Sequence, residues 1–458
     1  MPAPASQPPQ QRQSQGPVLD FFADLGPGLI TGAADDDPSG IATYSVTGAA
    51  FGYGLLWTAL FAFPMMAAVQ LMCSRLGMIT GRGLAAVVRR RYSRWVLWGA
   101  CLLLTVANVI NIGADLGGMA DAMHMMTGIS ALWWTPAFAG ILVAMLLWTS
   151  YRAIARTFKW LTAVLFAYVI TAFLAKPDWT QVLRATFVPE MRWSSEYLSV
   201  FVGVLGTSIS PYLFFWQSSQ EVEEERAEGK KTLVQRQGAT VEELRRARRD
   251  VITGMFFSNF AMYFIILTTA ATLHAHGVTK IVTARQAAEA LRPLAGDAAY
   301  LLFTIGLIGT GMLGVPVLAG SSAFAISEAM AWGATLDRKP SVTPKFYAVL
   351  AVAMALGVGL NYAGLNAVQM LFWAAVVNGV LAPPLIVLVV LLTSDRSVMG
   401  DHVSPPLLKW LGWITAGGQQ RESLRLCRRM VTRKGRDLRY PPRRNRPAPH
   451  SGPVPNRH

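Results

Sequence analysis

The stretch TGAADDDPSGIATY, residues 31–44, decides how this chain must fold. It places three consecutive aspartates and the helix breaker Pro38 inside an apolar run, and residues 26–54 contain no lysine or arginine. Proline lacks the backbone N–H that a helix interior needs, and it interrupts the helix where it stands. We therefore expect two short helices here, separated by an acidic break.

The composition places this break inside a membrane protein. Of the 458 residues, 53% are hydrophobic and 15% are charged, whereas a soluble domain carries about 25% charged residues. A helix needs about 20 apolar residues to cross the hydrocarbon core, and lipid leaves no backbone group unpaired. We predict an all-α integral membrane protein with about ten transmembrane helices, at residues 24–50, 52–76, 95–118, 132–149, 158–175, 195–218, 252–273, 298–326, 345–363 and 366–393.

The positions of lysine and arginine predict the orientation of the chain. These residues are frequent in the loops that follow the second, fourth and sixth predicted spans and sparse in the other loops. Positively charged loops stay in the cytoplasm. We expect a multi-pass protein of the plasma membrane, here the bacterial inner membrane, with both termini in the cytoplasm.

The two ends differ from the apolar core. Residues 1–19, rich in Pro, Gln and Ser, predict a disordered cytoplasmic arm. Residues 396–458 predict a basic, disordered cytoplasmic tail, in which residues 407–418 resemble an eleventh span that stops too short to cross. We hypothesise an altered reading frame near Gly417. An unstructured appendage suits this tail better than an arm that binds anionic lipid or nucleic acid, and no nucleic-acid partner is expected.

A second interrupted span follows in GVLGTSISPYLFFWQSSQ, residues 203–220, where small and hydroxylic residues lead into Pro211. Two sets of five helices, a first repeat at about residues 20–176 and a second at about 195–395, place the two interrupted spans in equivalent positions. Matching broken spans in two halves are typical of transporters with inverted repeats and a binding site near the middle of the membrane.

The residues around the two breaks predict the kind of ligand. A carboxylate with freed carbonyls and hydroxyls suits a hard divalent cation, whereas sulfur and imidazole select softer metals. Residues 34–45 and 206–217 contain no methionine, cysteine or histidine. The sequence therefore predicts a cation site lined by oxygen alone. Cys73, Cys101 and Cys427 are too scattered for a zinc site or a disulfide framework.

Both stretches resemble the hallmark segments of the NRAMP (natural resistance-associated macrophage protein) divalent metal transporters, and the resemblance spans residues 20 to about 395. In that family the first helix carries an Asp-Pro-Gly-Asn signature and the sixth a Met-Pro-His signature. Asp37 and Pro38 match the first two positions, which implies that Asp37 binds the metal. The resemblance also implies a LeuT-like 5+5 inverted repeat.

The departures from the family pattern change the expected cargo. Ser39 and Gly40 replace the family's glycine and asparagine, and Ser210 and Tyr212 replace its methionine and histidine. Without the thioether the site loses its preference for soft ions, and a more open site lets Mg²⁺ keep several waters. This pattern resembles the NRAMP-related magnesium transporters.

The same comparison bears on proton coupling. Asp115 stands where the family has an aspartate on its proton route, but the acids expected nearby appear as Asn108 and Gly118, and Gln217 replaces a second histidine. A proton relay needs titratable groups, so we expect little or no coupling. The polar residues Asn108, Asn111 and Asp115 either form a strip that faces the bundle interior or make ordinary hydrogen bonds between helices.

The resemblance assigns roles to further residues. The expected metal ligands are Asp37, the carbonyls of Ala34 and Thr207, Ser210 and the open position at Gly40. The expected groups around the hydrated ion are Asp36, Tyr212, Gln217, Asn378 and Asp115. We interpret residues 221–250 as a solvated charged loop rather than a Mg²⁺ sensor built from its glutamates.

The predicted function is a uniporter-like secondary transporter that imports Mg²⁺ and Mn²⁺, with no resident cofactor and with lipid as its surroundings. Two alternatives remain: a proton-coupled importer of Mn²⁺ or Fe²⁺, and a carrier of small organic solutes. The chain has no HExxH, GxSxG or P-loop motif, so an enzyme is not expected. The sequence leaves the oligomeric state open, with a monomer as one possibility.

Overall fold

The computed structural model describes residues 26–149, 163–336 and 340–439, apart from the side chains beyond residue 428, and these residues contain helices but no strand. The helices before the undescribed gap are α2 (Pro27–Asp35), α3 (Pro38–Phe51), α4 (Trp57–Thr80), α5 (Leu84–Arg91), α6 (Arg94–Thr127) and α7 (Ala131–Trp148). Up to residue 272 follow α9 (Phe166–Leu174), α10 (Trp179–Phe187), α11 (Ser195–Ser208), α12 (Pro211–Ala227), α13 (Leu233–Arg236) and α14 (Val241–Thr272).

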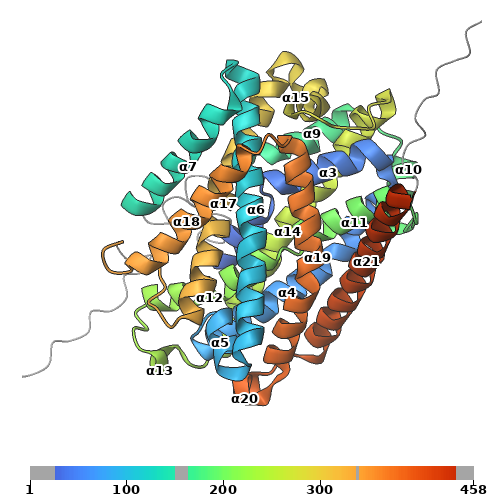
Figure 1. The fold of residues 1–458 in the computed structure, drawn as a ribbon. Coiled ribbons are helices and arrows are strands. Elements are labelled where there is room, and N and C mark those ends of the chain that lie inside the picture. Colours follow the sequence, from blue (N-terminus) through green and yellow to red (C-terminus); the bar gives the residue numbers. More distant parts are fainter. Residues whose placement is uncertain (1–25, 150–162, 337–339, 440–458) are drawn as a thin grey trace, which may run out of the picture.

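The remaining helices complete the bundle shown in Figure 1. They are α15 (Ala284–Ala288), α16 (Arg292–Ala295), α17 (Ala299–Ala329), α18 (Pro344–Asn361), α19 (Ala367–Ser394), α20 (Arg396–Met399) and α21 (Pro406–Arg439). Short 3₁₀ turns lie at Gly52–Leu55, Ala163–Leu165, His274–His276, Glu289–Leu291, Gly296–Ala298 and Gly400–His402. The predicted arm at residues 1–19 lies outside the described residues.

The all-α prediction is confirmed. Eight helical segments of the described chain are long and apolar enough to cross a membrane. The first predicted span is not among them because it is divided into α2 and α3, and the fifth, 158–175, lies partly outside the described residues. Large apolar side chains such as Leu102, Val106 and Val352 are more than half exposed on the outside of the bundle, as expected of helices that face lipid.

Both predicted interruptions are present. α2 ends at Asp35 and α3 begins at Pro38, while α11 ends at Ser208 and α12 begins at Pro211. Each proline occupies the first helical position, where its missing N–H costs nothing because that position has no partner inside the helix. The breaks therefore follow directly from the local sequence.

Close backbone contact holds the interrupted helix α2 against α14. A Cβ on Gly32 would lie 2.2 Å from the carbonyl oxygen of Gly254, and one on Gly254 would lie 2.1 Å from that of Gly28. Helices in lipid gain little from apolar burial against each other, so small residues that allow close packing are what join them. The glycines fix the position of the first break.

The acidic segment after the second break is not the solvated loop that the sequence predicted. α12 continues to Ala227, and the side chains of Glu221, Glu223 and Glu225 are at most 5% exposed. Glu221 accepts hydrogen bonds from Ser74 (2.6 Å) and from Gln217 (2.8 Å). A run of charges is buried here because its partners come from other helices or from an earlier turn, which the local sequence does not reveal.

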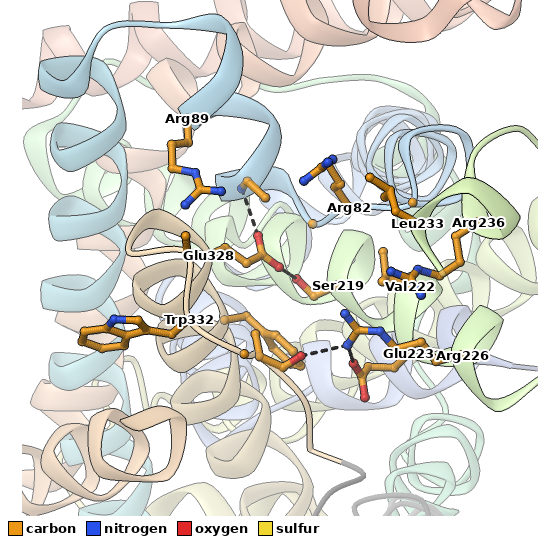
Figure 2. Close-up of a pocket in the computed structure, with 17 residues that line it drawn as sticks. Arg82, Arg89, Ser219, Val222, Glu223, Arg226, Leu233, Arg236, Glu328 and Trp332 are labelled. Carbon is orange, nitrogen blue, oxygen red and sulfur yellow. Dashed lines mark hydrogen bonds and ion pairs between the residues drawn. The ribbon is translucent and has the colours of Figure 1, made fainter. Parts of the chain in front are cut away.

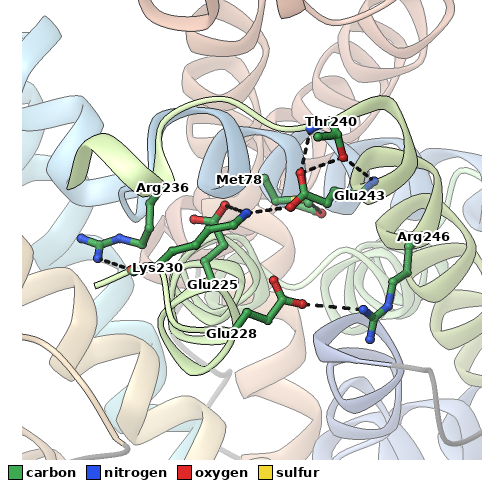
Figure 3. Close-up of polar contacts among 9 residues, drawn as sticks. Met78, Glu225, Glu228, Lys230, Arg236, Thr240, Glu243 and Arg246 are labelled. Atoms are coloured by element: carbon green, nitrogen blue, oxygen red, sulfur yellow. Dashed lines mark hydrogen bonds and ion pairs between the residues drawn. The ribbon is translucent and has the colours of Figure 1, made fainter. Parts of the chain in front are cut away.

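The following turn is also ordered by its charges (Figure 3). Lys230 Nζ lies 2.7 Å from Glu243 Oε1 and 3.4 Å from Glu225 Oε1, and so joins the end of α12 to the start of α14. Glu243 also accepts from the backbone N–H of Thr240, which caps α14. Residues 228–243 therefore form a compact connection at one end of the bundle.

The tail contains a long helix where the sequence predicted a truncated span and disorder. α21 starts beside α20 and packs along α19, α4 and α11. At its far end the Arg425 guanidinium lies 4.4 Å from the ring centroid of Trp193, just before α11. Residues 406–428 therefore form an ordered helix that packs along the bundle, where the sequence predicted disorder.

The prediction failed because polar side chains on α21 are buried against other helices. Gln419 and Ser423 are 2% and 4% exposed, and the Ser423 hydroxyl donates to the carbonyl of Gly379 at 3.1 Å. Counted by apolar residues alone, a membrane span would end at Gln419. The helix passes through Gly417, where the sequence suggested that the span ends.

We expect Gly32→Val to destabilise the protein, because the new side chain meets the backbone of α14. Overpacking costs about 1–3 kcal/mol, and a backbone that cannot move aside places this change at the upper end. Gly99→Ala is the control, since a Cβ there meets nothing within 4 Å. Thermal unfolding in detergent should show a lower midpoint for Gly32→Val only, and equal midpoints would contradict the packing described.

Candidate metal site

Asp37 closes the first turn of α3. Its Oδ1 accepts hydrogen bonds from the backbone N–H of Gly40 (2.8 Å) and from the Ser39 hydroxyl (2.7 Å). The first amides of a helix have no partner inside the helix, and a capping carboxylate both satisfies them and interacts favourably with the helix dipole. Asp37, 2% exposed, is therefore held in one orientation.

The second carboxylate oxygen of Asp37 faces two other helices. Oδ2 accepts from the amide of Asn111 on α6 (3.0 Å) and from the hydroxyl of Tyr212 on α12 (3.3 Å). The Tyr212 hydroxyl also lies 3.0 Å from the carbonyl oxygen of Ala34, in the last turn of α2. Tyr212 thus brings together both interrupted helices, the predicted ligand Asp37 and the predicted carbonyl ligand.

A second carboxylate supports the same helix terminus. Asp115 Oδ1 on α6 accepts from the backbone N–H of Ser39 at 3.2 Å, and its Oδ2 has no hydrogen-bond partner in the part of the chain that the structure describes. α17 passes closely on another side, where a Cβ on Gly314 would lie 2.9 Å from the Cβ of Asp37. The space around Asp37 is therefore bounded by α3, α6, α12 and α17.

The polar residues of α6 have two different roles. Asn111 and Asp115 face the break, as one sequence interpretation proposed. Asn108 instead donates to the Leu318 carbonyl and to the Ser321 and Ser322 hydroxyls of α17 at 2.8–3.0 Å. Asn111 and Asp115 thus face the bundle interior, whereas Asn108 makes ordinary hydrogen bonds between helices.

Asp35 and Asp36 point to a different partner. The Ser258 hydroxyl of α14 lies 2.7 Å from Asp35 Oδ2 and 3.3 Å from Asp36 Oδ1. Both side chains are buried, at 1% and 4% exposure. Among the three aspartates, only Asp37 has a hydrogen bond to Tyr212. No sequence pattern points to Ser258, which lies 223 residues beyond Asp35 within an ordinary apolar span.

Asp250, also absent from the sequence predictions, caps α2. Its carboxylate accepts from the backbone N–H groups of Gly26 (2.9 Å), Gly28 (2.6 Å) and Leu29 (3.0 Å). Both halves of the interrupted helix thus begin on a carboxylate. An acidic residue where α14 enters its apolar part could have suggested a buried partner, but nothing in the sequence identifies that partner as α2.

The second break supplies further oxygen atoms. The Ser210 hydroxyl donates to the carbonyls of Thr207 (2.6 Å) and Gly206 (3.1 Å) and so covers the end of α11. Gln217 accepts from Thr31 at 2.6 Å, which links α12 to α2. Asn378, 2% exposed on α19, takes part in none of these contacts. The predicted residues thus divide between the Asp37 cluster and its surroundings.

The donors beside Asp37 are its own carboxylate, the Ala34 carbonyl, the Tyr212 hydroxyl and the Asn111 amide, and the Asp115 carboxylate binds the same helix terminus. Among the residues that the structure describes, no three His, Cys, Asp or Glu side chains form a metal-binding group. Two thioethers that the sequence stretches did not include lie nearby. The Ser208 hydroxyl is 3.2 Å from Met262 Sδ, and a Cβ on Gly311 would meet both Met119 Sδ and Pro38. Neither makes a hydrogen bond with Asp37.

Comparison with known proteins shows the family of the chain. Residues 28–419 match the family described as natural resistance-associated macrophage protein-like, Nramp. The chain is 28% identical over 413 residues to the divalent metal cation transporter MntH of Deinococcus radiodurans, with 86% of each chain covered.

Solved structures show the same fold. The manganese transporter of Eremococcus coleocola superposes with a TM-score of 0.70 at 17% identity, covering 95% of this chain and 91% of that one. Mhp1, a nucleobase-cation-symport-1 family transporter, superposes with a TM-score of 0.54 at 14% identity, covering 91% and 94%. The fold is therefore LeuT-like, as the resemblance to the NRAMP transporters implied. The chain belongs to the Nramp family, whose members are transporters and not enzymes.

Proposed function

We propose that this protein is a uniporter-like secondary transporter that imports Mg²⁺ and Mn²⁺ through the site around Asp37. The observation that carries the proposal is the cluster of Asp37, Ala34 and Tyr212, which joins one carboxylate, one freed carbonyl and one hydroxyl from both interrupted helices. The relatives with printed functions, a divalent metal cation transporter and a manganese transporter, support a divalent cargo.

The roles follow from which atoms are already engaged. Asp37 Oδ1 is fixed by Ser39 and Gly40, so Oδ2 is the oxygen that would bind the ion when Asn111 and Tyr212 turn toward its waters. The carbonyls of Ala34 and Thr207 and the Ser210 hydroxyl would contact the ion or its waters. Tyr212, Gln217, Asn378, Asp36 and Asp115 would surround the hydration shell.

The preference for a hard ion rests on this donor set. Mg²⁺ takes oxygen ligands and sheds its waters reluctantly. With serine at position 210 and tyrosine at 212, no sulfur or imidazole belongs to the cluster around Asp37. The magnesium-transporting branch of the family is therefore the one we propose.

The proton-coupled importer is the second candidate, and a specific observation keeps it in view. Asp115 is fully buried beside α3, and one of its oxygens makes no hydrogen bond with the described residues, so a titratable group lies close to the site. An observation against proton coupling is that Asn108 donates to a carbonyl and a hydroxyl of α17, neither of which is a titratable group. An organic-solute carrier is disfavoured because Asp37 itself occupies the helix terminus at which a substrate carboxylate would bind.

The orientation that we propose places the end with α5, α13 and α20 in the cytoplasm of a bacterial cell (Figure 1). Arginines and lysines gather there, in α5, in the segment between α12 and α14 and in the first turns of α14, as the positive-inside rule requires. Gly26 lies at this end, beside Glu225 and Asp250. We therefore propose a cytoplasmic amino terminus.

Asp37→Asn should abolish most transport while leaving the fold intact. Asparagine keeps the helix cap but removes the negative charge, and contacts of a charged group are worth about 1.5–3 kcal/mol, or about tenfold or more. Uptake of Mg²⁺ and Mn²⁺ into proteoliposomes is the measurement, with an internal pH dye to detect proton movement. Asp35→Asn is the control, since Asp35 bonds to Ser258. Equal uptake by wild type and Asp37→Asn would refute the site, and metal-driven acidification would favour the coupled candidate.

Ser210→Met should shift the preference toward soft ions, because it restores a thioether at the second break. We expect the ratio of Cd²⁺ to Mg²⁺ uptake to rise about tenfold or more relative to wild type, on the scale of one ligand contact. Ser210→Leu has a similar size, loses the same hydroxyl and lacks sulfur, so it should not raise the ratio. A rise of equal size in both variants would show that volume, and not sulfur, sets the preference.

Tyr212→Phe should reduce uptake about tenfold, since it removes the one group that bonds to both Asp37 and Ala34, and losses around a metal site are commonly of that size. The apparent affinity for Mg²⁺, measured from the concentration dependence of uptake, should fall with it. Tyr362→Phe removes an exposed hydroxyl that donates to Leu132 and should change neither quantity. An unaltered concentration dependence in Tyr212→Phe would exclude Tyr212 from the site.

A further inference from the structure

A basic cavity lies far from Asp37, at the end of the bundle that carries α5 and α13 (Figure 2). Its volume is about 260 Å³. The walls come from four helices and two turns: α5 and the turn before it, α12, α13, and the end of α17 with the residues that follow. Four arginines line it: Arg82, Arg89, Arg226 and Arg236.

The two glutamates of the cavity are already bound to its walls. Glu328 accepts from the Ser219 hydroxyl (2.9 Å) and from the backbone N–H of Ala86 (3.1 Å). Glu223 accepts from Arg226 and from the Thr335 hydroxyl. These carboxylates hold α5, α12 and α17 together, and Arg226 forms an ion pair with Glu223.

The other three arginines keep donors available. The guanidinium groups of Arg82 and Arg89 form no hydrogen bond or ion pair with the residues that the structure describes. Arg236 is 7% exposed. One of its terminal nitrogens donates to the carbonyls of Lys230 and Lys231, whereas its Nε has no partner among the described residues. A buried donor without a partner is costly, so this nitrogen indicates a missing acceptor.

Electrostatics point the same way. Burial, together with the positive charges of Arg90, Arg89 and Arg236, lowers the pKa of Arg82. Arginine nevertheless stays charged, so the groups repel one another across the cavity. An anion placed between them would relieve that repulsion and supply the acceptors that Arg236 lacks.

We propose that this cavity binds a phosphate or diphosphate group through Arg82, Arg89 and Arg236. The guanidinium fork matches two oxygens of a phosphate, and arginine is the residue most suited to such bidentate contacts. The volume is below the range of about 300–1,000 Å³ that holds a drug-sized molecule, so it suits the charged group and not a whole nucleotide. The group can come from a soluble phosphate compound or from the headgroup of an anionic lipid.

The test uses the full chain in nanodiscs of phosphatidylcholine, without divalent cations, and measures binding of pyrophosphate by calorimetry. We expect saturable binding by wild type, weakened about tenfold or more in the double variant Arg82→Gln/Arg89→Gln. The control Arg248→Gln/Arg249→Gln removes two exposed charges of α14 that do not line the cavity, and it should bind as wild type does. Arg236→Lys, which keeps the charge but loses the fork, should also weaken binding.

A second arm distinguishes the lipid source. Native mass spectrometry after purification with phosphatidylglycerol counts the lipids retained by wild type and by both double variants. Loss of one retained lipid in Arg82→Gln/Arg89→Gln alone, without pyrophosphate binding, would assign the site to a lipid headgroup and support the proposed chemistry. The proposal is overturned when neither ligand binds, or when both double variants lose binding equally.

Discussion

A helix that is broken inside a membrane must find partners for the backbone groups that the break releases, and the arrangement of this protein depends on how it does so. The amides at the start of α3 are taken by Asp37 and Asp115, and those at the start of α2 by Asp250. The carbonyl of Ala34 at the end of α2 is taken by Tyr212. Since lipid offers no hydrogen bonds, these contacts make the break possible.

The same contacts determine what the site can bind. Because the amides of α3 hold one oxygen of Asp37, the other is directed between α6 and α12. The Tyr212 hydroxyl ends beside both this oxygen and a freed carbonyl, so the groups that repair the break are also the oxygen donors that a hard cation prefers. The structural requirement and the proposed function therefore share one set of atoms.

The local sequence predicted the parts of the structure that depend on neighbours along the chain. Prolines 38 and 211 interrupt their spans as expected, because each effect acts within a few residues. The expectation that Tyr212 lies near the ion comes from the family resemblance, and the structure adds its contact with the Ala34 carbonyl.

Contacts between distant segments could not be predicted in this way. Asp250 and Ser258 lie in α14, more than 200 residues beyond the groups they bind, and either residue would look unremarkable in its own segment. α21 and the extended α12 were missed for the related reason that their polar side chains are buried against other parts of the bundle. Hydropathy depends only on the residue type, whereas burial depends on which other segments pack against the side chain.

The most direct test of the central claim is the position of a bound ion. Anomalous diffraction from crystals grown with Mn²⁺ locates the metal without reference to transport. The account predicts a single strong peak next to the Asp37 carboxylate and the Ala34 carbonyl, with Tyr212 turned toward the ion or its waters. A peak between Asp35, Asp36 and Ser258, with Asp37 still bonded to Tyr212 and Asn111, would contradict it.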